Sequence, residues 1–172
     1  MIIETYPSSW LRRFCNTVSR DDTPHYRSSV ELAIDECKKH NALGIASNQL
    51  GYCGSFIVVK CGDVFMPMIN PVLQKNVTRS VSLCKEGCLS FPNLYVKRKR
   101  FETVWVDYMD LNGKNMIAKF DGLEAVCVQH EIDHIQGKLF YDDVSDAELG
   151  AAIIYANVNH NMKYNLKTLR AL

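Results

Sequence analysis

The sequence predicts an α+β protein in which antiparallel or mixed β-sheets pack around one central helix. Three observations support this fold class. Runs of β-branched and apolar residues of strand length fill the middle of the chain, a strong hairpin signal joins two of them, and one clearly patterned helix follows. Strands that precede and surround a single helix are typical of α+β folds, whereas a doubly wound sheet needs strands and helices in regular alternation.

Length and composition limit the class of protein. A chain of 172 residues, 47% of them hydrophobic, suits one domain, so we expect residues 1–172 to form a single domain with a short C-terminal helix and tail from about 145. The net charge of +1 gives no support for binding to nucleic acid or to a membrane surface. Because residues 1–7 do not resemble a targeting peptide and no apolar stretch is long enough to cross a bilayer, we expect a soluble cytoplasmic protein.

The cysteines indicate a reducing compartment. Their number is odd and no secretory signal precedes them, so we expect free thiols, from which a metal ligand can be drawn. The seven positions are Cys15, Cys37, Cys53, Cys61, Cys84, Cys88 and Cys127.

The first third of the chain predicts one helix and one loop. Thr23-Pro24 is typical of a helix start, with proline in the first turn. Apolar residues then recur at helical spacing as far as about His40. Glycines punctuate residues 41–51, which we expect to form a loop.

The strands follow in the middle of the chain. Residues 55–60 and 64–69 are runs of strand length, and Asn70-Pro71 is expected to end the second. Residues 103–111 and 115–120 flank Asn112-Gly113, the strongest short-range hairpin signal. The basic run at 97–100 alternates with apolar neighbours, which indicates a strand with one solvated face.

The patterned helix carries the chemistry. Asp121 with Glu124 suggests a capped start, and Gly137 lies where a left-handed stop is expected. His130 and His134, four residues apart, share one helix face, so both imidazoles can reach one metal ion with Glu131 beside it. Leu123 and Cys127 continue this stripe, which predicts that the metal face is also the buried face.

A catalytic metal usually takes three protein ligands, so one more is needed. Cys88 is the best candidate, because Gly87 and the following Ser-x-Pro suggest a sharply bent strand edge. His25, His160 and Asp133 compete with it. Asp133 fits better as a residue that fixes an imidazole or pairs with an arginine.

Residues 43–49 form a third candidate segment. The small Gly44 lets a substrate backbone approach closely, and the Gln49 amide can stabilise a developing oxyanion. Alone, such a segment is more often a simple turn.

Three segments together resemble bacterial-type peptide deformylases, including short phage-encoded members. The resemblance extends from about residue 10 to about residue 142 and is carried by three motifs. They are Ala42 to Gln49, Glu86 to Ser90, and Gln129 to His134.

The resemblance implies a ligand set and a mechanism. Cys88, His130 and His134 would bind one divalent metal, physiologically Fe²⁺, with Zn²⁺, Ni²⁺ or Co²⁺ able to replace it in preparations. Glu131 would be the general base that takes a proton from water. The Gln49 amide and the Leu89 backbone N–H would hold the formyl oxygen as it becomes an oxyanion.

The resemblance also implies a substrate and a cellular setting. The backbone of Leu43 and Gly44 would pair with the peptide, and Leu123, Val126 and Cys127 would line the pocket for methionine. The partners would be N-formyl-methionyl nascent peptides and the ribosome exit region, with no nucleic acid and no membrane. We expect a monomer in the cytoplasm of a bacterium, or of the host if a phage encodes it.

The chain departs from the family at Ala42, Ser47 and Asn48, which affects the expected shape of the cleft. A methyl at position 42 requires a negative φ. After about residue 145, Ser145 to Glu148 predicts a capped helix, followed by an asparagine-rich end that we expect to pack loosely. Two other functions remain: a zinc peptidase with Glu148 or His160 as third ligand, and a non-catalytic metal-binding or ribosome-associated module.

Overall fold

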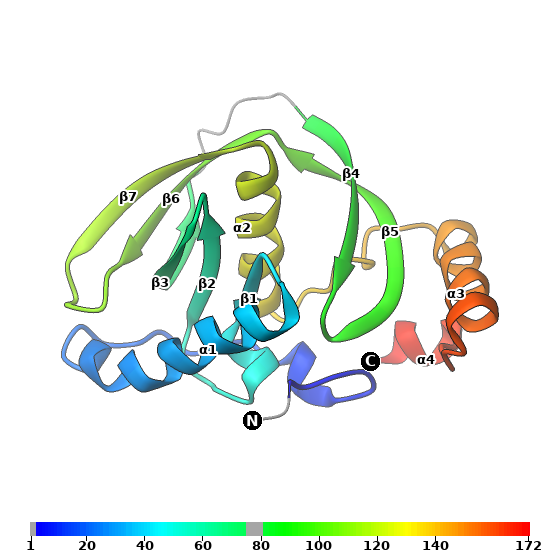
Figure 1. The fold of residues 1–172 in the computed structure, drawn as a ribbon, viewed down its shortest axis with the longest axis horizontal. Helices are drawn as coiled ribbons and strands as arrows, with labels where there is room; N and C mark the ends of the chain where they lie inside the picture. The colour runs from blue at the N-terminus through cyan, green and yellow to red at the C-terminus, as the bar shows by residue number, and fades with distance from the viewer. Residues whose placement is uncertain (1–2, 75–80) are drawn as a thin grey trace.

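A computed structural model describes residues 3–74 and 81–172 (Figure 1). Residues 1–2, part of the segment expected not to be a targeting peptide, lie outside the described ranges. The helices are α1 (Arg27–His40), α2 (Gly122–Ile135), α3 (Asp146–His160) and α4 (Leu166–Ala171). The 3₁₀ turns are η1 (Ser9–Arg12), η2 (Thr23–Tyr26) and η3 (Ser47–Leu50). None of the described helices is long and apolar enough to span a membrane.

The strands form two antiparallel sheets, which confirms the α+β class. The larger has the order β1-β2-β3-β6-β7, and the smaller pairs β4 with β5. Their bounds are β1 Gly44–Ala46, β2 Phe56–Cys61, β3 Val64–Leu73, β4 Val81–Cys88, β5 Phe91–Phe101, β6 Thr103–Met109 and β7 Asn115–Asp121. The hairpin predicted at Asn112-Gly113 joins β6 to β7, with Gly113 at φ +73°.

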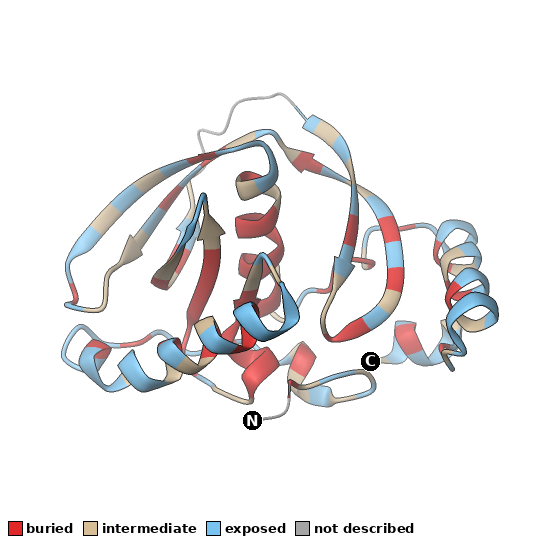
Figure 2. Ribbon diagram, in the orientation of Figure 1, coloured by how far each residue is buried: buried red, intermediate tan, exposed pale blue. Residues whose placement is uncertain are grey.

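Helix α2 lies between the two sheets and is buried along most of its length (Figures 1 and 2). Alternation along β2 explains how the larger sheet is covered on both faces. Ile57 and Val59 pack toward α2, whereas Phe56 and Val58 pack toward α1. A third apolar cluster joins β5 to α3 and α4. The helix with the histidines is therefore held from two sides.

Several expected boundaries were wrong for local reasons. Residues 23–26 form the 3₁₀ turn η2, so α1 begins four residues later than Thr23. The expected loop at 41–51 contains β1 and η3. The three residues of β1, of which Ile45 and Ala46 are buried, pair with β2 but are too short a run to show a period. Asn70 has φ +51° and produces a bulge, after which β3 continues to Leu73 rather than ending.

The β4–β5 hairpin was mostly missed. The strand around 97–100 was predicted correctly. Of its partner β4 only the bent end at Cys88 was expected, because Val81–Cys88 mixes apolar, charged and small residues. In the observed register Lys85 stands opposite Lys97, and the register shifts between Gly87 and Cys88. That shift ends the regular pairing where Cys88 turns toward α2.

The C-terminal end packs more tightly than expected. Ser145 caps α3 by accepting from the Glu148 backbone N–H, as predicted. Three asparagines near the C-terminal end have defined roles. The Asn157 side chain makes two hydrogen bonds of 2.9 Å with the Tyr164 backbone. Asn161 ends α3 at φ +51°, and Asn165 caps α4. Side chains that hydrogen-bond backbone groups leave no apolar period, which is why the pattern suggested a loose tail.

Candidate active site

Helix α2 has the predicted stop but lacks the predicted cap. The Asp121 carboxylate accepts a hydrogen bond from the Thr103 hydroxyl and makes no capping bond to α2, so the predicted capped start was wrong. The predicted stop is confirmed, because Gly137 has φ +68°. A Cβ there would lie 2.5 Å from the Arg12 carbonyl oxygen, so the chain leaves the helix at a position that only glycine fits.

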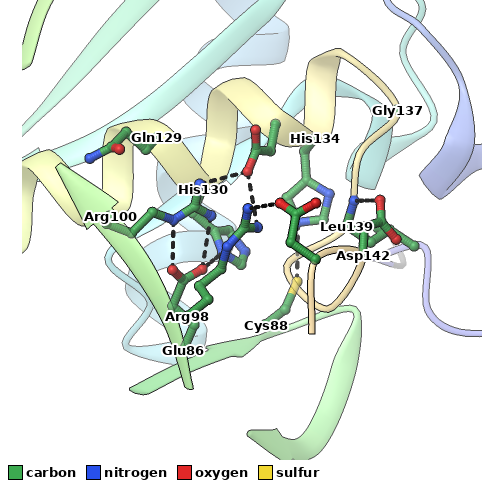
Figure 3. Close-up of polar contacts among 12 residues, drawn as sticks. Glu86, Cys88, Arg98, Arg100, Gln129, His130, His134, Gly137, Leu139 and Asp142 are labelled. Atoms are coloured by element: carbon green, nitrogen blue, oxygen red, sulfur yellow. Dashed lines mark hydrogen bonds and ion pairs between the residues drawn. The ribbon is translucent and has the colours of Figure 1, made fainter. Parts of the chain in front are cut away.

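Three potential metal ligands converge where α2 meets the end of β4. One donor atom each from Cys88, His130 and His134 lies within 4.8 Å of the others. The Cys88 Sγ lies 3.2 Å from the His134 Nε2, and the two imidazole ring centres are 4.9 Å apart. The spacing of four residues has therefore placed both rings on one side of the helix, with the cysteine opposite them (Figure 3).

Glu86 holds His130 from behind, and the sequence reasoning did not assign it. Its Oε2 lies 2.8 Å from the His130 Nδ1, so the other ring nitrogen is left for a metal (Figure 3). Burial opposes ionisation, but hydrogen bonds with His130 and Arg100 outweigh it and lower the pKa of Glu86 to about 2. The available sequence signal was the spacing of Glu86 and Cys88. Side chains two residues apart in a strand point to the same face, and both residues belong to β4.

The basic run at 97–100 divides between two faces of β5. Arg100 is buried and binds Glu86 at 2.6 Å and Asp133 at 2.6 Å, while Arg98 binds Asp133 at 3.2 Å. The pairing of Asp133 with arginine was anticipated. Arg98 and Arg100 face α2, whereas Lys97 and Lys99 are the exposed residues of the run, as expected for a strand with one solvated face.

Glu131 is buried beside the three donor atoms. Its side chain lines the cleft, yet its residue is only 4% exposed. The Oε2 atom is buried and has no hydrogen-bond partner among the described residues. Burial, opposed by the proximity of His130, raises the pKa of Glu131 to about 7. An unpartnered carboxylate oxygen next to a ligand cluster indicates that a bound molecule completes the site.

The segment after β1 is anchored by its own polar side chains. The Gln49 Oε1 accepts from the Ala46 N–H at 2.8 Å, and its Nε2 donates to the Ser90 hydroxyl at 3.0 Å. The same Nε2 lies 3.4 Å from the Cys88 Sγ. Asn48 donates to the His134 carbonyl oxygen at 2.6 Å, which ties this segment to the end of α2.

The departures from the family motif are accommodated. The backbone φ of Ala42 is not positive, so its methyl group is tolerated. The preceding residue, Asn41, adopts the left-handed conformation at φ +50°. Ser47 lies 3.3 Å from the Cys15 Sγ in the core.

A cleft of about 780 Å³ brings the predicted site residues together. Those that line it are Leu43, Gly44, Gln49, Cys88, Leu89, Leu123, Val126, Cys127, His130 and Glu131. His134 is not part of the lining and lies beneath, 1% exposed. The stripe was expected to be buried throughout, but Leu123 is 64% exposed at the mouth because it belongs to the first turn of α2.

The competing ligands lie elsewhere. His25 is a surface residue 3.8 Å from Asp22, and His160 lies against Tyr155 at the end of α3. The Glu148 carboxylate accepts a hydrogen bond from the Ser145 hydroxyl in the first turn of α3. Within residues 3–74 and 81–172, Cys88, His130 and His134 form the single cluster able to hold a metal.

The donor set fits a divalent transition metal. Thiolate and imidazole are ligands for Fe²⁺ and Zn²⁺, and three of them leave a position for water. Burial keeps the pKa of His134 below its ordinary value, and the neutral imidazole is the form that binds metal. The carboxylate behind His130 is the usual support for such a ligand.

Comparison with known proteins agrees with this site. The model of the family described as Polypeptide deformylase matches residues 1–149. A peptide deformylase of Pseudoalteromonas translucida is 34% identical over 143 residues, which cover 81% of this chain and 84% of the relative.

Two solved structures are similar in fold and sequence. The Synechococcus elongatus deformylase in complex with actinonin has a TM-score of 0.81 at 32% identity, covering 88% of this chain and 83% of its own. The Acinetobacter baumannii deformylase bound to Met-Ala-Ser has a TM-score of 0.76 at 25% identity, covering 83% and 96%. The chain therefore belongs to the polypeptide deformylase family, whose members are metal-dependent hydrolases that remove the formyl group from nascent peptides.

Proposed function

We propose that this protein removes the N-formyl group from the N-terminal methionine of newly made polypeptides and releases formate. The observation that carries the proposal is the unpartnered Glu131 Oε2 beside three convergent ligand atoms, at the base of a cleft. A buried general base next to a ligand cluster serves hydrolysis, whereas a binding module has no use for it.

The ligands of the metal would be Cys88, His130 and His134. A divalent metal, when bound, supplies a water of lowered pKa and a Lewis acid for the formyl carbonyl. The thiolate donates charge and weakens that Lewis acidity, so the protein groups around the carbonyl matter more. We propose Fe²⁺ as the native metal, which makes the thiolate site sensitive to oxygen.

Glu131 would act as the general base. Its carboxylate would accept a proton from the attacking water and later deliver it to the leaving amine. The raised pKa suits this exchange near neutral pH, because the group can both take and return a proton. The free Oε2 would be the atom that receives it.

Two donors would stabilise the developing oxyanion. The Gln49 amide is fixed by Ala46 and Ser90, so it needs little reorganisation as charge develops. The Leu89 backbone N–H, in the turn directly after Cys88, would be the second donor. Removing one such donor typically costs about 2.7–4 kcal/mol in the barrier.

The cleft suits a methionyl peptide. Leu123, Val126 and Cys127 would surround the methionine side chain, and the backbone of Leu43 and Gly44 at the edge strand β1 would pair with the peptide. That the similar Acinetobacter baumannii deformylase binds Met-Ala-Ser supports a methionyl tripeptide as a product. We place the reaction in the cytoplasm of a bacterium or of a phage-infected host.

Replacement of the base tests the proposal. The protein and a Glu131→Ala variant would be prepared without oxygen, loaded with Fe²⁺ and incubated with a formyl-methionyl tripeptide. We expect the variant to keep its metal and to lose nearly all formate release. Retention of most activity by the metal-loaded variant would contradict the assigned base.

A further inference from the structure

We propose that the cleft selects formylated chains with an acidic side chain at the second or third residue, through Lys85 held on the ring of Tyr95. This inference rests on the proposed function and specifies its substrate class. Both residues line the cleft and both are exposed, on the β4–β5 wall.

Lys85 is positioned by its neighbours. Its Nζ lies 4.8 Å from the centre of the Tyr95 ring, as a cation–π contact. The ring lies across Gly87, where a Cβ would stand only 2.5 Å from the Tyr95 Cε1. The absence of a side chain at Gly87 therefore lets the aromatic ring lie flat on β4 and present the ammonium group to the cleft.

The charge of Lys85 is not neutralised within the described part of the chain. None of the carboxylates there lies within 4.0 Å of its Nζ. Lys97 stands directly opposite Lys85 across the hairpin, and like charges at such positions are unfavourable. An acidic ligand would relieve this repulsion.

Two of the three acidic groups that line the cleft, Glu36 and Glu86, are paired with cations. Glu36, on the opposite wall, lies 3.5 Å from the Lys39 Nζ and 3.3 Å from the His40 Nε2. Glu86 binds Arg100, and Glu131 lies at the base beside the ligand cluster. The β4–β5 wall therefore presents the unneutralised positive charge of Lys85, whereas Lys39 is paired with Glu36. The free carboxylate oxygen of Glu131 is buried at the base of the cleft.

The distance along the strand suggests which substrate residue is read. Lys85 precedes Cys88 by three residues in β4, which corresponds to about 10 Å of extended chain. A peptide that leaves the metal site in extended form covers the same distance by its second or third residue. The Lys85 ammonium would then lie beside the side chains that follow methionine.

Three substrates that differ only in charge test the proposal. They are formyl-Met-Glu-Glu-amide, formyl-Met-Gln-Gln-amide and formyl-Met-Lys-Lys-amide, with the C-terminal carboxylate removed so that it supplies no charge. We expect kcat/KM to fall in that order, with about a tenfold span between Glu and Lys at low salt and a smaller span at high salt.

Two variants and one control assign the effect. Lys85→Met keeps the aliphatic stem and should reduce the preference, and Lys85→Glu should reverse it. Lys167→Glu, on exposed α4, makes the same change in net charge and should leave the order intact.

The possible failures are distinguishable. Equal kcat/KM values within about twofold, with all three peptides hydrolysed, would overturn the inference and leave the proposed function standing. An unchanged preference in Lys85→Glu would also overturn it. No formate from any peptide would overturn the proposed function together with this inference.

Discussion

Gly44 shows how little space surrounds the proposed base. A Cβ at this position would lie 2.8 Å from the Cys127 Sγ and 2.9 Å from the Glu131 Oε1. We expect Gly44→Ala to displace Glu131 and to lower kcat/KM by about a hundredfold, since small misplacements of catalytic groups have effects of this size. Gly150→Ala is the matched control, because a Cβ there meets nothing within 4 Å and helix α3 should gain about 0.5–1 kcal/mol. Equal activity of both variants would contradict the tight fit.

Cys37 gives stability a dependence on alkaline pH. Its side chain is 0% exposed, and burial raises the pKa of the thiol from 9.0 to about 12. Between these values the unfolded chain loses the proton and the folded chain keeps it, so stability falls as pH rises above about 9. Between pH 8 and pH 10, the free energy of unfolding measured with urea should fall by about 1 kcal/mol more for the wild type than for Cys37→Ala. Parallel pH profiles would show that Cys37 ionises normally in the folded state.

At the scale of elements, a series of ion pairs joins the β4–β5 hairpin to α2 and supports the proposed metal site. In this series Arg98 and Arg100 of β5 bind Asp133 of α2, and Arg100 also binds Glu86, which holds His130. Glu86→Gln would weaken the hold on His130 and leave Arg100 with one fewer carboxylate. We expect metal affinity, measured by competition with a chelator, to fall by about 10–100-fold. Asp143 pairs with Arg98 at the outer end of this ion-pair series, and its side chain is 80% exposed. Asp143→Asn should therefore change metal affinity little. If both variants bound metal like the wild type, Glu86 would have no role in holding the ligand.

The junction of α3 and α4 depends on a single asparagine. Asn157 satisfies both backbone groups of Tyr164, whose ring is buried and whose hydroxyl donates to the Pro92 carbonyl oxygen. Asn157→Ala should therefore cost about 1–3 kcal/mol and speed amide hydrogen exchange at Tyr164. Asn159→Ala, whose amide donates within α3 on the exposed side, should cost much less. A loose end, as the sequence suggested, would show the same fast exchange in all three proteins.

For the whole molecule, the parts predictable from sequence were those with a regular period or a strong spacing. The hairpin at Gly113, the stop at Gly137 and the capped α3 follow from local chemistry and were confirmed. The short strand β1 and the hairpin strand β4 were missed, because their places depend on pairing with distant strands. Local sequence does not specify such partners.

The same division applies to the candidate site. The spacing of His130 and His134 on α2 predicted two neighbouring rings, and the structure brings Cys88 to them from the end of strand β4. Glu86 behind His130 was not assigned: its spacing from Cys88 placed it near the site, but its contacts with His130 and Arg100 depend on how the β4–β5 hairpin packs on α2. Spacing along one helix is thus readable from sequence, whereas contacts between elements require the fold.

The central claim is that the formyl amide bond is the bond cleaved. The most direct measurement is mass spectrometry of formyl-Met-Ala-Ser and of unformylated Met-Ala-Ser after incubation with the Fe²⁺-loaded protein under exclusion of oxygen. We expect the formylated peptide to become Met-Ala-Ser with one equivalent of formate, and the unformylated peptide to remain intact. Cleavage between residues of either peptide, or an unchanged formylated peptide with metal bound, would contradict the account.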